Sequence, residues 1–432
     1  MREDQHEATV PPLTAAERSQ YFSARCKAED DEFGALCSRI NVEALKSRAS
    51  ALRNGIECSI EPIQHDLERR SNMGGMNYHI QIRFEDGGVW FARIRRLKAT
   101  SPPPVVRDYI LKSEVATLMF LETTAVPAPK VYDYALEQSD NPVGVGYILM
   151  AKLPGKPLDW PAATPDQRRK VMDQLADLQI EIFKYPLPVL GSMNTPGSAE
   201  IGGSAHEMLL SVMGDQLQSC SPFHLAEAHR THILQLTLHR ILKEEMYTQR
   251  CVDAYLIHRF LLDLVPKLTP AHQNTDGNFY LKHGDDKGDH ILVDENFNIT
   301  GVIDWEWAHT AAPADAFNSP IGLLPVADFY VGKGVVGEDE AVFAQILEAK
   351  GYGSLARHVL GGRLQHLFTF CCGFHLSDWD GFLGLFQGLR DASGVDAGTG
   401  WEEWKEAALN RYKDDGGLQE LLIRCGRSGN GP

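Results

Sequence analysis

The chain has 432 residues, of which 43% are hydrophobic and 23% are charged, and its formal net charge is −16. This composition is typical of a globular protein long enough for two or three domains, and it excludes a disordered chain. The acidity argues against non-specific binding of nucleic acids, which needs a basic surface, so we expect no nucleic-acid partner.

Hydrophobic residues with helical spacing dominate residues 1–59, which we interpret as a helical amino-terminal extension. The period then changes to that of strands, and a turn at residues 85–88 predicts a β-hairpin. Residues 60–152 therefore predict a small antiparallel sheet with one helix. Its strands are expected at 78–84, 89–94, 130–135 and 146–153, and its helix at 108–121.

Residues 153–432 are predicted to be mainly helical, with one exception. Helical patterns cover 164–183 and 205–268, separated by a loop-like stretch at 185–204. The exception is a hairpin at 279–306 that carries several acidic residues. The sequence thus predicts an α+β, bilobal protein, with a small antiparallel β-sheet lobe and a large mainly α-helical lobe.

The eight cysteines are scattered without a C-x-x-C pair. This favours free thiols over a disulfide framework or a zinc site. No hydrophobic run approaches the ~20 residues that span a bilayer, and the first residues do not resemble a signal peptide. We therefore expect a cytoplasmic protein with no membrane association, and the sequence leaves its oligomeric state open.

Two aspartates stand out in the hairpin. Asp285 follows His283-Gly284 on a tight turn, and Asp304 follows the apolar run 299–303. Two short strands would deliver both carboxylates to one end of the hairpin. This suits a reaction in which one acid receives a proton while the other holds a divalent metal on a phosphate chain. The alternative for Asp285 is a turn-capping role.

His290 lies between Asp289 and the apolar strand 291–293. It is either a metal ligand or a histidine hydrogen-bonded in place. The local His and Asp residues can also be read as a transition-metal cluster, which would indicate a metallohydrolase, although their spacing matches no zinc signature. That cluster would comprise His283, Asp285, Asp286, Asp289, His290 and Asp304.

The small lobe contains candidate groups for an anionic ligand. Arg93 on a strand and Glu114 on the following helix can pair and present positive charge to an anion, or form a purely structural ion pair. Gly74-Gly75 would let backbone amides approach phosphates, but is equally a plain turn. The segment from Met150 to Leu153 links the two lobes, and its backbone could bind a nucleobase.

At this point the sequence resembles the aminoglycoside phosphotransferase and choline kinase-like family, especially its fungal-type members. The resemblance runs over residues 59–324 and rests mainly on HGDDKGDHILVD and ITGVIDWEWA, which are similar to the family's H-G-D-x-x-x-x-N-I-L-V and I-D-W-E signatures. Support comes from GGMNYHIQIRFEDGGVWFARI, SEVATLMFLETT, VPAPKVYDY and YILMAKLPGKPL.

The resemblance implies a protein-kinase-like fold, with ATP and Mg²⁺ as cofactors and transfer of the γ-phosphoryl group to a small-molecule hydroxyl. The resemblance implies that Asp285 is the aspartate of the catalytic loop and that Asp304 is the main Mg²⁺ ligand. Arg93, with Glu114 as its partner, would bind phosphate. The acidic residues suit an acceptor that is cationic or polyhydroxylated. Further cofactor-binding residues would be Gly74, Gly75, Asn77, Met150 and Leu153.

The sequence departs from the family pattern in the loop after Asp285. His290 replaces the metal-binding asparagine, and imidazole is a poor Mg²⁺ ligand, so Asp289 is the candidate for the missing oxygen. In the family a downstream aspartate supports this loop, and in this sequence the nearest match, Asp315, is displaced by one position. Two alternatives therefore stay open: a catalytically impaired protein that binds a nucleotide or a partner, and a kinase-like fold that transfers a different group, such as an adenylyl group.

Overall fold

The computed structural model describes residues 15–60, 74–98, 101–213, 216–220, 222–268, 277–373 and 378–428. The chain divides into two compact units. Unit 1 comprises Met1–Asp108 and Val131–Lys152, and unit 2 comprises Tyr109–Lys130 and Leu153–Pro432. The expected segments 1–59 and 60–152 lie in unit 1, with one exception. Residues 109–130 belong to unit 2, as do residues 153–432.

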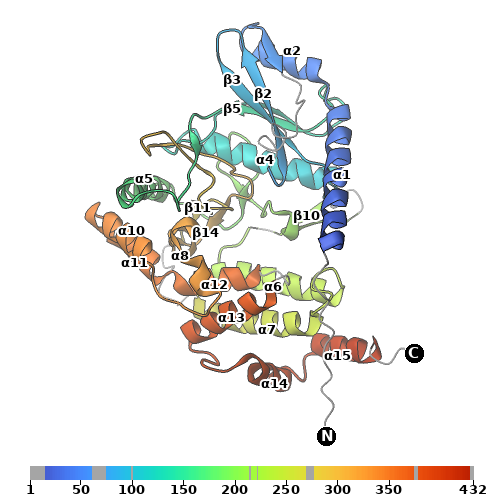
Figure 1. Cartoon of the computed structure of the whole chain (residues 1–432), viewed down its shortest axis with the longest axis vertical. Coiled ribbons are helices and arrows are strands. Elements are labelled where there is room, and N and C mark those ends of the chain that lie inside the picture. The colour runs from blue at the N-terminus through green and yellow to red at the C-terminus, as the bar shows by residue number, and fades with distance from the viewer. Residues whose placement is uncertain are drawn as a thin grey trace. The chain divides into compact units, whose positions relative to one another are not determined.

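Unit 1 is built on a five-stranded antiparallel sheet with the strand order β1-β2-β3-β5-β4 (Figure 1). The predicted hairpin is confirmed, because β2 pairs with β3 so that Tyr78 lies opposite Ile94. The strands are β1 (Cys58–Ile60), β2 (Asn77–Phe84), β3 (Val89–Arg95), β4 (Val131–Ala135) and β5 (Tyr147–Ala151).

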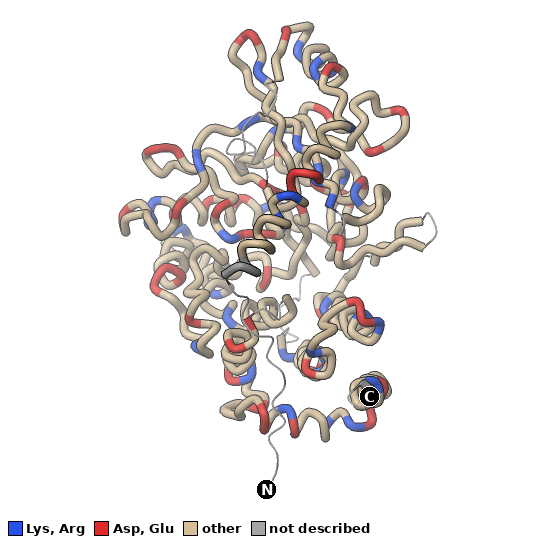
Figure 2. The backbone as a smooth tube through the Cα atoms, turned by 45° about the vertical axis from the view of Figure 1, so that its right-hand side comes forward, with Lys and Arg blue, Asp and Glu red and all other residues tan. Residues whose placement is uncertain are grey.

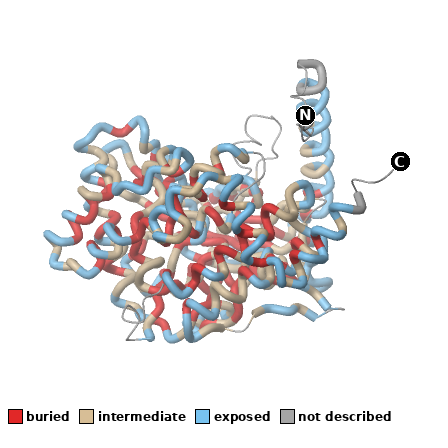
Figure 3. The backbone as a smooth tube through the Cα atoms, turned by 90° about the horizontal axis from the view of Figure 1, so that it is seen from below, coloured by how far each residue is buried: buried red, intermediate tan, exposed pale blue. Residues whose placement is uncertain are grey.

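The core of unit 1 lies between this sheet and two helices, α1 (Ala15–Arg39) and α2 (Val42–Leu52). Alternate residues of β2 are buried, and they join Leu36 at the end of α1 and Leu45 of α2 in one apolar cluster. Burial of these side chains is the main stabilising term of the unit. Residues 19–35 of α1 are largely exposed (Figure 3).

Unit 2 is mainly helical and contains several short strand pairs. Helix α4 (Pro104–Leu121) begins in unit 1 and continues into unit 2. The other helices are α5 (Pro165–Phe183), η1 (Glu207–Leu209), α6 (Ala226–Leu242), α7 (Cys251–Leu268), α8 (Pro313–Ala316), η2 (Ile321–Leu323), α9 (Val326–Phe329), α10 (Glu338–Ala349), α11 (Gly353–Gly361), α12 (Arg363–Cys372), α13 (Trp379–Ser393), α14 (Trp401–Arg411) and α15 (Gly416–Ser428). The strands are β6 (Lys156–Pro157), β7 (Ser192–Met193), β8 (Ile201–Gly202), β9 (Leu210–Met213), β10 (Gln216–Ser219), β11 (Tyr280–Lys282), β12 (Ile291–Val293), β13 (Ile299–Val302) and β14 (His309–Ala311).

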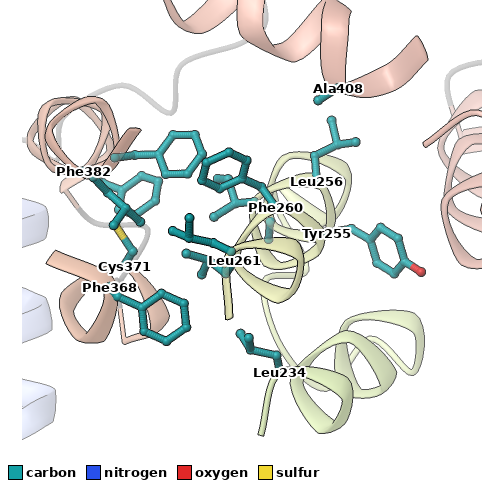
Figure 4. Close-up of a cluster of buried hydrophobic side chains, with 14 of the residues drawn as sticks. Leu234, Tyr255, Leu256, Phe260, Leu261, Phe368, Cys371, Phe382 and Ala408 are labelled. Atoms are coloured by element: carbon teal, nitrogen blue, oxygen red, sulfur yellow. The ribbon is translucent and has the colours of Figure 1, made fainter. Parts of the chain in front are cut away.

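The larger core of unit 2 surrounds α7, which packs against α6 and α12 (Figures 1 and 4). Phe260 of α7 meets Phe386 edge to face with 5.3 Å between ring centroids, and Trp404 with 5.8 Å. Such edge-to-face pairs stabilise a core beyond the area that they bury. This cluster holds α6 and α12 in place, and residues of both helices also line a pocket.

A second core holds the predicted acid-bearing hairpin in place. Helix α5, which the sequence predicts at 164–183, begins with a capping box between Thr164 and Gln167. It packs with α10 and α11 against strands β11 and β12, and the ring of Phe183 stacks on Tyr280 at 5.3 Å. The strands on which the acids depend are therefore anchored by ordinary apolar packing.

One part of the predicted helical region is not helical. The structure places the β9–β10 hairpin within 205–268, ahead of α6 and α7. All eight cysteines are free thiols, as expected. Basic and acidic residues are interspersed along the backbone (Figure 2). Among the described residues, no helix combines the length and the hydrophobicity that a bilayer crossing requires.

Candidate active site

The acids of interest lie on two loops that connect two antiparallel strand pairs in unit 2. Strand β12 pairs with β13, and β11 pairs with β14 so that Lys282 lies opposite His309. One loop therefore runs over 283–290 and the other over 303–308. The Ile303 N–H donates to the His290 carbonyl at 2.9 Å, which joins the two loops where they meet the β12–β13 pair.

The ring of His283 ties the two loops together. Its Nε2 lies 2.9 Å from the carbonyl oxygen of Ile303, and its Nδ1 accepts a hydrogen bond from the backbone N–H of Asp285 at 3.0 Å. Because Nδ1 accepts, Nε2 carries the hydrogen and donates it. Burial lowers the pKa of His283, which favours this neutral form. A single buried imidazole thus fixes the backbone of Asp285 relative to the residue that precedes Asp304.

Two close approaches explain the sequence of these loops. A Cβ atom at Gly284 would lie 2.7 Å from the Trp307 carbonyl oxygen, so this position needs glycine. Asp304 and Trp307 both adopt left-handed backbone conformations, each with a φ of 64°. Aspartate tolerates this region better than most residues, whereas for tryptophan it is unfavourable. Strain of this kind is concentrated at functional sites in proteins.

Three carboxylates act on one lysine. The Nζ of Lys287 lies 2.9 Å from a carboxylate oxygen of Asp285. The pKa of Lys287 is raised mainly by this hydrogen bond, and further by the charges of Asp285, Asp289 and Asp304. Asp285, Asp289 and Asp304, which the sequence predicted to be catalytic or metal-binding, therefore all lie within electrostatic range of Lys287.

The side chain of His290 points into the protein. Its ring stacks on His283 with 4.2 Å between centroids, and its Nδ1 accepts the Gly288 N–H at 3.3 Å. Burial lowers the pKa of His290 to about 2, so the ring is neutral with its hydrogen on Nε2. In this arrangement neither ring nitrogen offers a lone pair to a metal, in contrast to the expected role as a ligand.

The oxygen donors suit Mg²⁺ better than a transition metal. Among the described residues, no three His, Cys, Asp or Glu side chains are placed to hold a metal ion together. Mg²⁺ is instead held by one or two carboxylates together with substrate phosphates and water, and the exposed Asp304 and Asp289 fit that requirement.

The predicted cofactor-binding residues are divided between the two units. In unit 1, the Gly74 N–H already donates to the Asn77 carbonyl at 2.8 Å, and Lys98 donates to the Gly75 carbonyl at 2.6 Å. Arg93 is buried on β3, where it lies opposite His79.

Three further predicted residues lie near the boundary between the units in sequence. Met150 is buried on β5 of unit 1. In unit 2, Glu114 is buried on α4. Leu153 packs over Gly301 of β13, because a Cβ atom there would lie 2.5 Å from the Leu153 Cδ1. Leu153 therefore contacts the β12–β13 pair from the same unit.

A pocket of about 280 Å³ borders the first loop. Its lining includes Gly284 and Asp286, the residues on either side of Asp285, together with parts of α6, α12 and β14. Asp315, one position out from the family pattern, lines it too and pairs with Arg230 of α6. The walls of the pocket come from segments that lie far apart in the chain.

Comparison with known proteins gives partial matches to fungal relatives. A subtelomeric hrmA-associated cluster protein of Aspergillus fumigatus is 35% identical over 125 residues, which cover 28% of this chain and 23% of that protein. Clavilactone A biosynthesis cluster protein Y of Ampulloclitocybe clavipes is 25% identical over 249 residues, covering 55% of this chain and 59% of that protein. The chain thus spans less than two thirds of the length of either relative.

Similar solved structures include a putative aminoglycoside phosphotransferase from Ralstonia eutropha, with 15% identity, a TM-score of 0.44, and coverage of 82% of this chain and 97% of that one. A putative fructosamine-3-kinase from Thermobifida fusca has 16% identity, a TM-score of 0.44, and coverage of 81% and 98%. The GDP complex of wild-type aminoglycoside 2'-phosphotransferase-IIIa has 17% identity, a TM-score of 0.43, and coverage of 78% and 93%.

The sequence profile of the phosphotransferase enzyme family matches residues 77–314, which is more than half of the chain. The matched range contains both acid-bearing loops and most of the antiparallel sheet of unit 1. The predicted α+β class is confirmed, with a small antiparallel sheet in one unit and a mainly helical second unit. This chain therefore belongs to the phosphotransferase enzyme family.

Proposed function

We propose that this member of the family is an ATP- and Mg²⁺-dependent phosphotransferase that acts on the hydroxyl group of a small molecule. The observation that carries the proposal is the double hydrogen bond of His283, to the Asp285 N–H and the Ile303 carbonyl. These two bonds fix the backbone of Asp285 relative to the residue before Asp304, although the two aspartates lie on separate loops. Phosphoryl transfer depends on such positioning more than on covalent chemistry.

In the proposed reaction, Asp285 aligns the acceptor hydroxyl and receives its proton. The hydroxyl oxygen attacks the γ-phosphorus, the bond from that phosphorus to the bridging oxygen of the β-phosphate breaks, and ADP leaves. Lys287 lies 2.9 Å from Asp285. Its positive charge would stabilise the negative charge that is distributed over the oxygens of the transferring phosphoryl group.

Asp304 is the proposed principal Mg²⁺ ligand, with Asp289 as the second oxygen donor. When bound, Mg²⁺ would neutralise charge on the phosphates of the nucleotide. We assign His290 a structural role, because it stacks on His283 and its Nδ1 accepts the Gly288 N–H. The residues proposed to contact the nucleotide are Gly74, Gly75, Asn77, Arg93, Glu114, Met150 and Leu153.

The main alternative is a protein that binds the nucleotide but transfers nothing, which the replacement of asparagine by His290 favours. Two measurements separate these functions. A shift of the thermal midpoint with ATP and Mg²⁺ reports binding, and transfer of label from γ-labelled ATP to a panel of alcohols reports catalysis. We expect both; binding without transfer across the whole panel would support the alternative.

Two controls sharpen this test. Asp304→Asn removes the charge but suits the left-handed backbone, so it should abolish transfer and leave the thermal midpoint without ligand unchanged. Normal turnover by this variant would contradict the assignment of Asp304 to the metal. ATP labelled on the α-phosphate should leave no label on the acceptor, whereas adenylyl transfer would label it.

A further inference from the structure

The charge of the acceptor can be inferred from the pocket beside Asp285, if the proposed function is correct. The pocket has a volume of about 280 Å³. This lies near the lower end of the ~300–1,000 Å³ typical of sites for drug-sized ligands. Its lining includes His283, Gly284 and Asp286, which are the chain neighbours of Asp285.

The four residues in the lining that carry a formal charge compensate one another. Arg230 forms an ion pair with Asp315. The Nζ of Lys282 lies 3.8 Å from a carboxylate oxygen of Asp286 and donates to the Asp315 carbonyl at 2.7 Å. A ligand with several ammonium groups needs surplus carboxylates, and an anionic ligand needs surplus cations. This pocket offers neither, since two cations face two anions.

The histidines of the lining do not change this balance. Burial lowers the pKa of His229 to about 4 and that of His366 to about 3, and it also lowers the pKa of His283 and His309. All four rings are therefore neutral near pH 7. The Nε2 atoms of His229 and His366 are buried without a hydrogen-bond partner among the described residues.

The remainder of the wall is largely hydrophobic. Side chains of α6, α12 and the adjoining loops cover it, among them Leu190, Ile233, Leu234, Ile321, Phe368 and Cys372. Apolar surface of a ligand is stabilised by contact with such a wall, whereas an unpaired ammonium group would lose its hydration there.

We propose that the pocket binds a compact, uncharged alcohol with a mainly hydrophobic body as the phosphoryl acceptor, and discriminates against polycationic aminosugars. This inference rests on the proposed function for the transfer step but not for binding. It replaces the prediction of a cationic or polyhydroxylated acceptor, which rested on acidic residues in the helices expected to line the acceptor pocket and did not take their pairing with cations into account.

The test compares two molecules that differ by one charge. Cyclohexylmethanol and its ring-aminomethyl derivative share a ring and a hydroxyl, and the second adds an ammonium group. We expect calorimetry on the full chain with Mg²⁺ and a non-hydrolysable ATP analogue to give at least tenfold tighter binding of the first, and no binding of kanamycin. Equal or tighter binding of the amine, or no binding of either alcohol, would overturn the inference.

A variant at the pocket should reverse this preference. Thr369 lines the pocket but is exposed, so Thr369→Glu should fold and would add an uncompensated carboxylate. We expect it to shift the ratio of the two affinities at least tenfold towards the amine, whereas Thr369→Val should leave the ratio within twofold. An unchanged ratio in Thr369→Glu would contradict the assignment of this pocket.

Binding and catalysis can fail separately in this design. If cyclohexylmethanol binds with the expected preference and receives no phosphoryl group, the charge assignment of the pocket stands and the proposed function is contradicted. If transfer occurs but only to the aminated molecule, the proposed function stands and this inference is overturned.

Discussion

The hydrophobic core around α7 and the loops that carry Asp285 and Asp304 belong to the same unit but are ordered by different forces. In the core, Phe260 is 1% exposed and packs against two further aromatic rings (Figure 4). In the loops, the backbone is held by hydrogen bonds to His283, and Asp304 has a positive φ. The core thus supplies stability, whereas the loops hold an unfavourable conformation.

This difference teaches where activity and stability can be changed separately. A residue in an unfavourable backbone region costs about 1–3 kcal/mol, so it persists only where its surroundings over-determine it. Changes to charged side chains on the loops should abolish the reaction without unfolding the protein. Changes in the core should unfold it without altering the chemistry of the folded fraction.

The first and largest effect is expected at Asp285. Asp285→Asn keeps the shape of the side chain but removes the proton acceptor, so kcat should fall by about 10²–10⁴-fold. The urea midpoint should change little, because the backbone N–H of Asp285 still donates to His283. Steady-state kinetics and urea unfolding check this; a variant with normal kcat would rule out Asp285 as the base.

The second effect falls on stability alone. Phe260→Ala should lower the free energy of unfolding by about 3–5 kcal/mol, because it leaves a cavity among Phe386 and Trp404. The exposed Leu360 provides a matched control, and Leu360→Ala should change stability by less than about 0.5 kcal/mol. Equal losses in the two variants would show that the cluster in Figure 4 does not form the core.

The third prediction concerns His283, which should affect both stability and activity. His283→Leu leaves the Asp285 N–H and the Ile303 carbonyl without partners, so stability should fall by about 2 kcal/mol. The displaced loop should lower kcat by about 10–100-fold, with a smaller change in the KM for the acceptor. His283→Gln, which can donate and accept, should recover part of kcat; a merely structural role predicts no such recovery.

The fourth prediction concerns pH and tests the core through its buried histidine. Burial lowers the pKa of His258 to about 4, whereas the unfolded chain binds this proton near pH 6.5. The contribution of neutral His258 to stability is therefore fully present above about pH 6.5 and is lost as the pH falls towards 4. Between pH 6.5 and pH 5, this histidine should account for about 2 kcal/mol. Urea unfolding of His258→Leu should show a loss smaller by that amount; an identical loss would contradict the assignment.

The smallest effect is expected at Lys287. Lys287→Met removes the cation that lies 2.9 Å from Asp285 and should lower kcat about tenfold, which corresponds to about 1.4 kcal/mol in the activation free energy. Lys287→Arg keeps the charge and should retain most of the activity. Since Lys287 is largely exposed, both variants should unfold at the same urea concentration as the parent chain.

Much of the architecture was predictable from the sequence, because local signals agree with the fold. The alternating pattern around β2 and β3 and the helical pattern at 164–183 both predicted the correct elements. The β12–β13 hairpin was also predicted correctly. The β9–β10 pair was missed, since a short hairpin between helical segments carries no strong period of its own.

The arrangement of the site was less predictable, because it depends on contacts between distant residues. The glycine at 284 is explained by the Trp307 carbonyl, and the histidine at 283 by Ile303, neither of which is a neighbour in sequence. His290 illustrates the same limit. Its position in the motif suggested a metal ligand, whereas its stacking on His283 indicates a structural part in the loop.

The separation between the pocket walls and the loops proposed to carry the reaction has a consequence for how the protein can diversify. Positions such as Ile233 and Thr369 lie on α6 and α12, whereas Asp285 and Asp304 lie between short strand pairs. Descendants of a common ancestor could therefore acquire new substrates by replacing side chains on two helices while inheriting the reaction unchanged. A library restricted to those helical positions is the natural starting point for redirecting this scaffold in the laboratory.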